Sequence, residues 1–222
     1  MLKSESGVRL ISFGKFINFI KVCNMNYLAH ACLSFGKPDI LLGNMINDFI
    51  KGKKQFDYPA AIHKGIRLHR AIDQFTDTHE ATRQLKSFFR PQYRLYSGAF
   101  ADVVYDHYLA NDPTEFASES ALKVFTGNTY QVLEANLSML PLPFQKMFPY
   151  MKEQDWLYNY RYTWGIQKSF GGLVRRAAYL QESEVAFELF CRHYNEMRLC
   201  YTAFYPDLKK FTALQLELLL NG

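Results

Sequence analysis

Three groups of histidine and carboxylate side chains stand at spacings that would place them together on helix faces. The first group is His69, Asp73 and Asp77, each four residues after the one before. Residues four apart on an α-helix project side by side, so these three side chains would form one row. Imidazole nitrogen with carboxylate oxygen suits a divalent ion such as Mn²⁺, Mg²⁺ or Zn²⁺. For His69 and Asp73 taken alone, however, an exposed His–Asp contact of small energy is the favoured interpretation.

The apolar residues around His69 indicate where its side chain would lie. The stripe along the same helix consists of Ala61, Leu68, Ile72 and Phe75. His69 falls at its edge. An edge position is where a side chain lines a cleft between packed helices. The pattern therefore predicts that His69 faces such a cleft.

The second group is Asp102, Asp106 and His107, on a segment otherwise rich in Phe, Val and Tyr. Asp102 and Asp106 share a helix face, and His107 lies about 100° further round the axis. Carboxylates on such a helix are costly to bury unless they are paired or bound to a metal. A metal site and a buried Asp–Arg pair both satisfy that requirement.

The third group is His30 with Asn44 and Asp48, the latter two again four residues apart. His30 taken alone is better explained as a hydrogen-bonded core histidine than as a ligand. Other chemistry has less support, because the sequence holds no phosphate-binding glycine loop, no dinucleotide-binding glycine motif, no G-x-S-x-G and no H-E-x-x-H. The four cysteines show no CxxC spacing, which favours reduced thiols in a cytoplasmic protein.

The elements that must position these groups are predicted to be helices, and the fold class is all-α. Alternating β-branched runs are missing, whereas helix signals are frequent. We expect Pro91 and Pro206 to end helices and Thr114 to cap one. The expected helices cover about 38–49, 59–76, 79–90, 93–109, 114–137, 153–162, 164–180 and 184–204, with a short helix in the proline-rich connector near 141–149 and a leucine-rich tail at 214–220.

Composition and charge indicate one soluble, multi-helix, bundle-like domain. The chain has 222 residues, 49% hydrophobic and 21% charged, as in ordinary globular proteins. Of its net charge of +5, residues 1–24 carry +3, so the rest lacks the concentrated basic field of a nucleic-acid binder. No segment is apolar and long enough to predict a membrane span. We expect residues 1–24 to be an extension and residues 25–222 to be the domain.

Together and in this order, the motifs resemble the bacterial acyl carrier protein phosphodiesterases. The resemblance runs from Met25 to about Phe211, and the block at 65–77 is its specific part. The matching blocks are Met-Asn-Tyr-Leu-Ala-His (25–30), Gly-Asn-Met-Ile-Asn-Asp-Phe (43–49), Gly-Ile-Arg-Leu-His-Arg-Ala-Ile-Asp-Gln-Phe-Thr-Asp (65–77), Asp-Val-Val-Tyr-Asp-His (102–107), Gly-Gly-Leu-Val-Arg-Arg (171–176) and Phe-Tyr-Pro (204–206).

The resemblance implies a helical enzyme, distantly similar to HD-type phosphohydrolases, that uses Mn²⁺. It would remove 4′-phosphopantetheine from the serine of holo acyl carrier protein and leave the apo-protein. An adjacent His-Asp pair, typical of HD enzymes, is absent here, since the order is Asp106-His107. The candidate metal ligands carried over are His30, Asp48, His69, Asp73, Asp102 and Asp106. The candidate catalytic residues are His69, Arg70, Asp73, Asp77 and His107.

Two further expectations concern positive charge. Arg70 would either hold a phosphoryl oxygen or pair with Asp77, which lies about 20° from it around the helix axis. Because acyl carrier proteins are acidic, a basic cluster would dock the substrate, and the dense group Arg83, Lys86, Arg90 and Arg94 is the hypothesis for that surface.

Two other functions stay open at this point. One is a small-molecule phosphohydrolase with the same metal site, and the other is a non-catalytic helical module that binds a carrier protein or a metal. The sequence does not indicate the oligomeric state.

Overall fold

The computed structural model describes residues 27–221, and within that range the chain forms helices and no strand. The all-α prediction is therefore confirmed. The expected extension at residues 1–24 lies outside the described residues. None of the helices between residues 27 and 221 is both long and apolar enough to cross a bilayer. The three cysteines in this range, Cys32, Cys191 and Cys200, are free thiols.

The described chain contains eleven α-helices and four short 3₁₀ turns. The α-helices are α1 (Tyr27–Cys32), α2 (Pro38–Ile46), α3 (Ala60–Thr78), α4 (Glu80–Tyr93), α5 (Ser97–Ala110), α6 (Glu119–Ala135), α7 (Leu142–Glu153), α8 (Trp156–Asn159), α9 (Thr163–Arg176), α10 (Glu184–Arg192) and α11 (Tyr194–Asn221). The 3₁₀ turns are η1 (Asn47–Phe49), η2 (Gly52–Asp57), η3 (Arg94–Tyr96) and η4 (Leu137–Met139).

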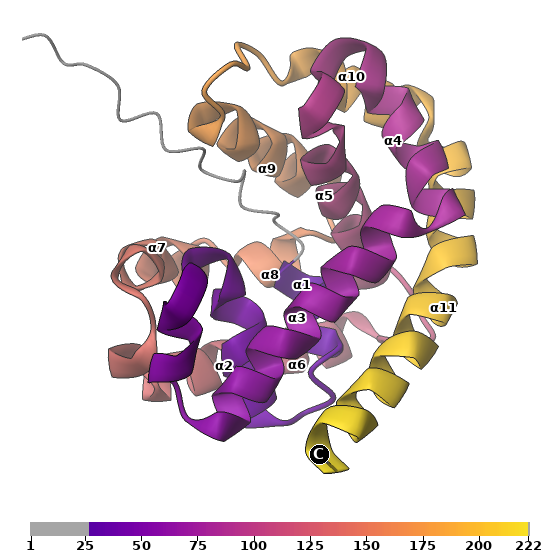
Figure 1. The fold of residues 1–222 in the computed structure, drawn as a ribbon. Helices are drawn as coiled ribbons and strands as arrows, with labels where there is room; N and C mark the ends of the chain where they lie inside the picture. The colour runs from indigo at the N-terminus through magenta and orange to yellow at the C-terminus, as the bar shows by residue number, and fades with distance from the viewer. Residues whose placement is uncertain (1–26, 222) are drawn as a thin grey trace, which may run out of the picture.

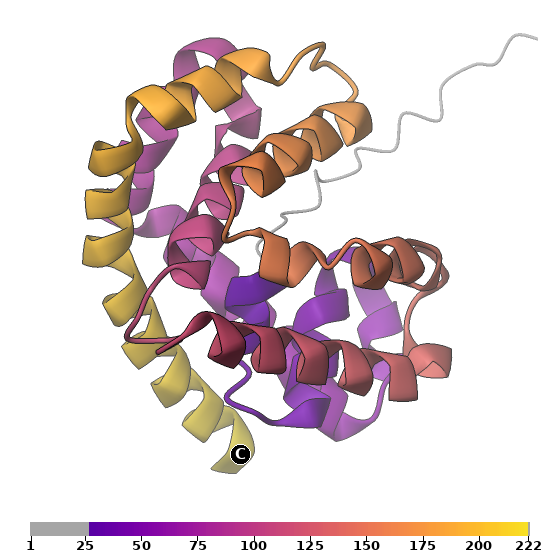
Figure 2. The ribbon, with the colours of Figure 1, turned by 180° about the vertical axis from the view of Figure 1, so that it is seen from behind.

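The helices are arranged around α1, α3 and α5, with α11 along one side. Figure 1 shows α2 and α3 packed against each other, while α4, α5, α9 and α10 gather at the opposite end. Seen from behind, α6 and α7 cover the side of α2 that faces away from α3 (Figure 2). The long α11 packs against α3, α4, α5 and α10, so it links both ends of the molecule (Figure 1).

Two prolines that were expected to end helices lie inside them, so those two predictions are wrong. Pro91 lies within α4, which continues to Tyr93, and Pro206 lies within α11. An internal proline costs about 3 kcal/mol because it removes a hydrogen bond and crowds the preceding turn. Buried side chains on both sides, such as Tyr93 in α4 and Leu208 in α11, keep each helix packed on the core. Tertiary packing here outweighs local propensity.

The predicted cap at Thr114 is also wrong, because that residue belongs to a turn. Its backbone N–H and its hydroxyl both donate to Oδ1 of Asp112, at 2.9 and 2.7 Å. The helix begins four residues later, where the hydroxyl of Ser118 accepts the N–H of Ala121 at 3.1 Å. Thr114 and Ser118 could each cap this helix. Because the side chain of Thr114 is hydrogen-bonded in the Asx turn at Asp112, Ser118 is the cap. In the proline-rich connector, α7 is a full helix of 12 residues.

The crossing of α2 and α3 is the closest approach that matters for the site. A Cβ atom added to Gly43 would lie 2.1 Å from the carbonyl oxygen of Ile62, and one added to Gly65 would lie 2.4 Å from that of Ile40. Only glycine permits such contact between two helix backbones. The crossing therefore fixes α2, with Asn44 and the following Asp48, against the face of α3 that carries His69.

Candidate metal centre

Two histidines from separate elements lie face to face in the core. His30 on α1 and His69 on α3 stack with ring centroids 3.9 Å apart and planes only 6° apart. Each residue is 2% exposed. Two imidazoles stacked this closely would repel each other strongly if both were protonated to imidazolium. The stacking therefore favours positive charge on no more than one of the two rings.

Asn44 orients both rings from the same side. Its side-chain Oδ1 lies 2.9 Å from Nδ1 of His30, and its backbone carbonyl lies 2.6 Å from Nδ1 of His69. The Asn44 amide nitrogen donates to the carbonyl of His30 and to the hydroxyl of Ser34. Since both Asn44 oxygens accept, each histidine must donate from Nδ1, and each Nε2 is turned the other way.

Two carboxylates face those Nε2 atoms. Asp73 places Oδ2 at 3.2 Å from Nε2 of His69 and Oδ1 at 3.5 Å from Nε2 of His30. Asp48, in η1, places Oδ1 at 3.3 Å from Nε2 of His69. The i, i+4 contact between His69 and Asp73 is the one that the sequence spacing predicted.

Burial and these charges act in opposite directions on the two rings. Burial lowers the pKa of His30, and the neighbouring His69 lowers it further. Burial also works to lower the pKa of His69, but the carboxylates of Asp73 and Asp48 raise it to about 10. For Asp73, burial is outweighed by the two histidines, which hold its pKa below the ordinary range. The two carboxylates therefore favour positive charge on His69, whereas burial disfavours it on His30.

The donor atoms of this cluster suit a divalent cation. Among the described residues, His30, His69 and Asp73 form the group whose ligand atoms all lie within 4.8 Å of one another. Nε2 of both histidines and Oδ1 of Asp73 are buried and have no hydrogen-bond partner. Buried polar atoms without partners are costly, and a cation that accepts all three would remove that cost. Mixed imidazole and carboxylate donors match borderline divalent metals.

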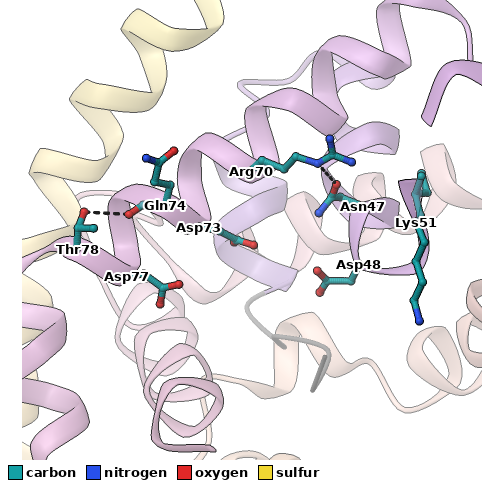
Figure 3. A pocket seen from close by; sticks show the side chains of 9 residues that line it. Asn47, Asp48, Lys51, Arg70, Asp73, Gln74, Asp77 and Thr78 are labelled. Carbon is teal, nitrogen blue, oxygen red and sulfur yellow. Dashed lines mark hydrogen bonds between the residues drawn. The ribbon is translucent and has the colours of Figure 1, made fainter. Parts of the chain in front are cut away.

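A pocket of about 480 Å³ opens directly onto the cluster. Figure 3 shows Asp48 and Asp73 on its wall from opposite sides, with Asp77 one turn further along α3. Its remaining lining residues are Asn47, Ile50, Lys51, Arg70, Gln74 and Thr78. A space of this size accommodates a small organic ligand. His69 was expected to line a cleft; it does not line the pocket itself, but its neighbours Asp48 and Asp73 do.

Arg70 and Asp77 have separate partners, so the expected pair between them is not formed. Arg70 donates from Nε to Oδ1 of Asn47 at 3.0 Å and from Nη1 to Oε1 of Gln55 at 2.6 Å. Asp77 instead accepts from Nζ of Lys86 at 2.7 Å. Both acceptors of Arg70 are neutral, so neither contact neutralises its positive charge. Figure 3 shows the contact with Asn47.

Asp102 is buried near the cluster without lining the pocket. Burial raises its pKa well above the ordinary value, and the negative charge of Asp73 raises it further. Lys86 acts in the opposite direction and more weakly. Asp102 is 4% exposed and therefore lies in the interior, near Asp73.

Asp106 and His107 lie outside this cluster, and their side chains have other partners. Both carboxylate oxygens of Asp106 accept backbone N–H groups, from Leu28 at 3.0 Å and Ala29 at 2.8 Å. The ring of His107 lies between the carbonyl of Tyr160 at 2.7 Å and the hydroxyl of Tyr194 at 3.0 Å. Their polar atoms are satisfied by the fold, so Asp106 holds α1 in place and His107 joins three segments.

The sequence patterns did not single out the residues that support the cluster. The spacing places Asn44 on one helix face with Asp48, and no pattern points to Ser34, Asn47 or Gln55. A buried amide among apolar residues in α2, at 0% exposure, is the signal in hindsight. Nothing local identified Gln55, because its partner Arg70 is fifteen residues away.

Comparison with known proteins gives a consistent result. A family model described as acyl carrier protein phosphodiesterase matches residues 25–208. A protein of that name from Pectobacterium atrosepticum is 30% identical over 86% of this chain and 99% of its own length. Those from Photorhabdus laumondii and Yersinia pestis are each 30% identical, covering 82% and 84% of this chain and 92% and 96% of their own. No solved structure matches the chain significantly.

Proposed function

Because the chain belongs to the acyl carrier protein phosphodiesterase family, we propose that it hydrolyses the phosphodiester between 4′-phosphopantetheine and the serine of holo acyl carrier protein. The products are the apo-protein and free 4′-phosphopantetheine. The observation that supports a metal-dependent route is the set of three buried donor atoms, on His30, His69 and Asp73, without a hydrogen-bond partner among the described residues. Mn²⁺ is the ion that we propose for this site.

His30, His69 and Asp73 would hold the cation, and Asp48 and Asp102 are the further candidates around it. When bound, a divalent ion supplies positive charge against the anionic phosphodiester and lowers the pKa of a water towards neutrality. The Nδ1 hydrogen bonds to Asn44 keep both imidazoles turned with Nε2 towards the cation position.

Arg70 binds one non-bridging phosphoryl oxygen of the substrate. Its guanidinium lines the pocket and keeps unused N–H groups, because Asn47 and Gln55 occupy only Nε and one Nη1 hydrogen. These two contacts also remove rotamer freedom before the substrate arrives. Neutralising the phosphodiester's charge makes attack on phosphorus easier.

Asp48 and Asp77 are the pocket carboxylates available to move protons. Asp48 lines the pocket opposite Asp73, and its carboxylate accepts the proton that the attacking water loses. Asp77, held by Lys86, stands one helical turn beyond and faces the same space (Figure 3). We assign it to the substrate side of the pocket, where it contacts the leaving serine or the pantetheine arm.

The test is mass spectrometry of the carrier protein after incubation with the purified chain. With Mn²⁺, Mg²⁺ and Zn²⁺ supplied in separate reactions, we expect loss of the phosphopantetheine mass in at least one, abolished by a chelator. Asp73→Asn should abolish turnover and metal binding while its thermal unfolding stays cooperative. An unchanged carrier mass with every metal would contradict the proposal.

The same experiment distinguishes the two other functions. A small-molecule phosphohydrolase would turn over a simple phosphodiester as well as or better than holo acyl carrier protein. A non-catalytic module would bind the metal or the carrier protein and leave its mass unchanged.

A further inference from the structure

A basic surface borders the pocket on the side of Arg70. It is built by the exposed loop around η2 and by the exposed face of α3 beside it. α3 and η2 contact each other. We call this the η2 basic surface, and it comprises Lys51, Lys53, Lys54, Arg67 and Arg70, all of them exposed.

The basic side chains of this surface outnumber the acids of its loop, and most of them form no ion pair with the described residues. Within 51–57 the sole acid is Asp57, against three lysines. Over the described part of the chain, Lys53, Lys54 and Arg67 have no ion pair. By contrast, the cluster expected from the sequence to dock the substrate is partly neutralised, since Arg83 pairs with Glu80 and Lys86 pairs with Asp77. Unpaired exposed charge attracts an oppositely charged partner over about a Debye length of 8–10 Å.

The loop is also tied to the pocket itself. Lys51 lines the pocket, and Gln55 accepts a hydrogen bond from Arg70 on the pocket wall. Phe56, next to Gln55 in the same loop, is 67% exposed, and its ring centroid lies 5.3 Å from that of His63. Exposed aromatic side chains are enriched at protein-binding surfaces.

The chemistry of the proposed reaction restricts where a carrier protein can dock. The bond that breaks joins phosphorus to a serine oxygen, and that serine is on the carrier's own surface. The pantetheine arm therefore cannot separate the docked protein from the site, and the docking surface must adjoin the pocket mouth. The η2 basic surface meets this condition.

Resting on the proposed function, we propose that the η2 basic surface docks the acidic face of holo acyl carrier protein and delivers its phosphoserine to the pocket. Lys53 and Lys54 contribute long-range attraction at the rim. Arg70 then exchanges solvent for a phosphoryl oxygen.

The test is the double substitution Lys53→Glu/Lys54→Glu, compared with two variants of equal charge change. Arg90→Glu/Arg94→Glu examines the competing surface on α4 and η3. Arg192→Glu/Arg198→Glu changes exposed positions on α10 and α11 that do not line the pocket. We expect the lysine variant to raise KM for holo acyl carrier protein about tenfold or more, with a much smaller change in kcat. Its KM should also depend less on salt than that of the unmodified protein. The variant on α10 and α11 should keep KM within about twofold.

Binding measured without turnover separates this proposal from the proposed function. In chelator, fluorescence anisotropy of labelled holo acyl carrier protein should show weaker binding to the Lys53→Glu/Lys54→Glu variant than to the unmodified chain. Weaker binding without hydrolysis by the unmodified chain under any metal would support docking and refute the activity. Unchanged KM and Kd in the lysine variant, or a larger effect in Arg90→Glu/Arg94→Glu, would overturn the docking proposal and leave the activity intact.

Discussion

Asn44 determines which nitrogen each histidine presents to the pocket. A backbone carbonyl can only accept, so Nδ1 of His69 must be its donor. The Asn44 amide nitrogen is occupied by His30's carbonyl and Ser34, so its Oδ1 must accept from Nδ1 of His30. One residue thus leaves both Nε2 lone pairs available to a cation.

Replacing Asn44 should therefore weaken metal binding without touching a ligand. We expect Asn44→Ala to lower Mn²⁺ affinity about 10–100-fold, because the ring of His30 loses its orienting partner. It should also destabilise the fold by about 1–3 kcal/mol, since Nδ1 of the buried His30 loses its acceptor. Titration calorimetry and urea unfolding measure the two effects.

Asn47→Ala is the matched control, because Asn47 holds Arg70 and contacts neither histidine. It should leave the Mn²⁺ dissociation constant within about twofold. Equal losses of affinity in the two variants would mean that Asn44 does not orient the rings.

The sequence predicted part of this site for a clear physical reason. His69 and Asp73 share one helix, and helical geometry alone brings them together. Asp106 and His107 show the limit of that argument, because spacing indicates which residues share a face but not what lies opposite. For Asp106 the neighbour is the backbone of α1, almost eighty residues earlier in the sequence.

At the scale of the elements, the contact between Gly43 and Gly65 sets the distance between α2 and α3. Neither Gly43 nor Gly65 has room for a methyl group, since the nearest atoms are backbone carbonyl oxygens that cannot rotate away. The separation of Asn44 from His69 depends on this approach. The site is therefore sensitive to a change that adds one carbon atom outside it.

We expect Gly43→Ala to destabilise the protein by at least about 2 kcal/mol and to weaken Mn²⁺ binding, because the helices must move apart. Gly127→Ala on α6 is the control, since a Cβ there would meet no atom within 4 Å. That variant should gain about 0.5–1 kcal/mol from improved helix propensity. Urea unfolding checks both signs, and a stabilised Gly43→Ala would refute the close-crossing interpretation.

Helix type could be predicted from the sequence, while several helix ends could not. Proline and threonine signals act within a few residues, whereas α4 and α11 continue past Pro91 and Pro206 because distant helices bury their next turns. The cap is Ser118 and not Thr114 because the hydroxyl of Thr114 donates to Asp112. Tertiary packing and alternative hydrogen bonds therefore determine helix ends that local propensity does not distinguish.

At the scale of the whole molecule, the candidate ligands come from elements that only the complete fold brings together. His30 comes from α1, Asp48 from η1, and His69 with Asp73 from α3. A cation bound by all of them binds the folded chain far better than the unfolded one. Metal and fold should therefore stabilise each other.

We expect Mn²⁺ at about 100 times its Kd to raise the free energy of unfolding by about 2.7 kcal/mol. A chain that begins at Met25, where the family match begins, should show the same increase and the same activity. Thermal unfolding with and without metal measures this for both lengths. A smaller increase in the shorter chain would assign residues 1–24 a part in the site, and no increase in either would contradict metal binding.

The glycine crossing also provides fixed reference positions from which the site residues can be located in other sequences. Measured from Gly43, the functional residues stand at +1 (Asn44) and +5 (Asp48); measured from Gly65, they stand at +4 (His69) and +8 (Asp73). An insertion between a glycine and its ligand would turn the ligand by about 100° away from the cluster, whereas an insertion between the two segments would not. A search that fixes G-N-x₃-D and G-x₃-H-x₃-D but lets the gap vary would therefore follow the geometry instead of overall similarity.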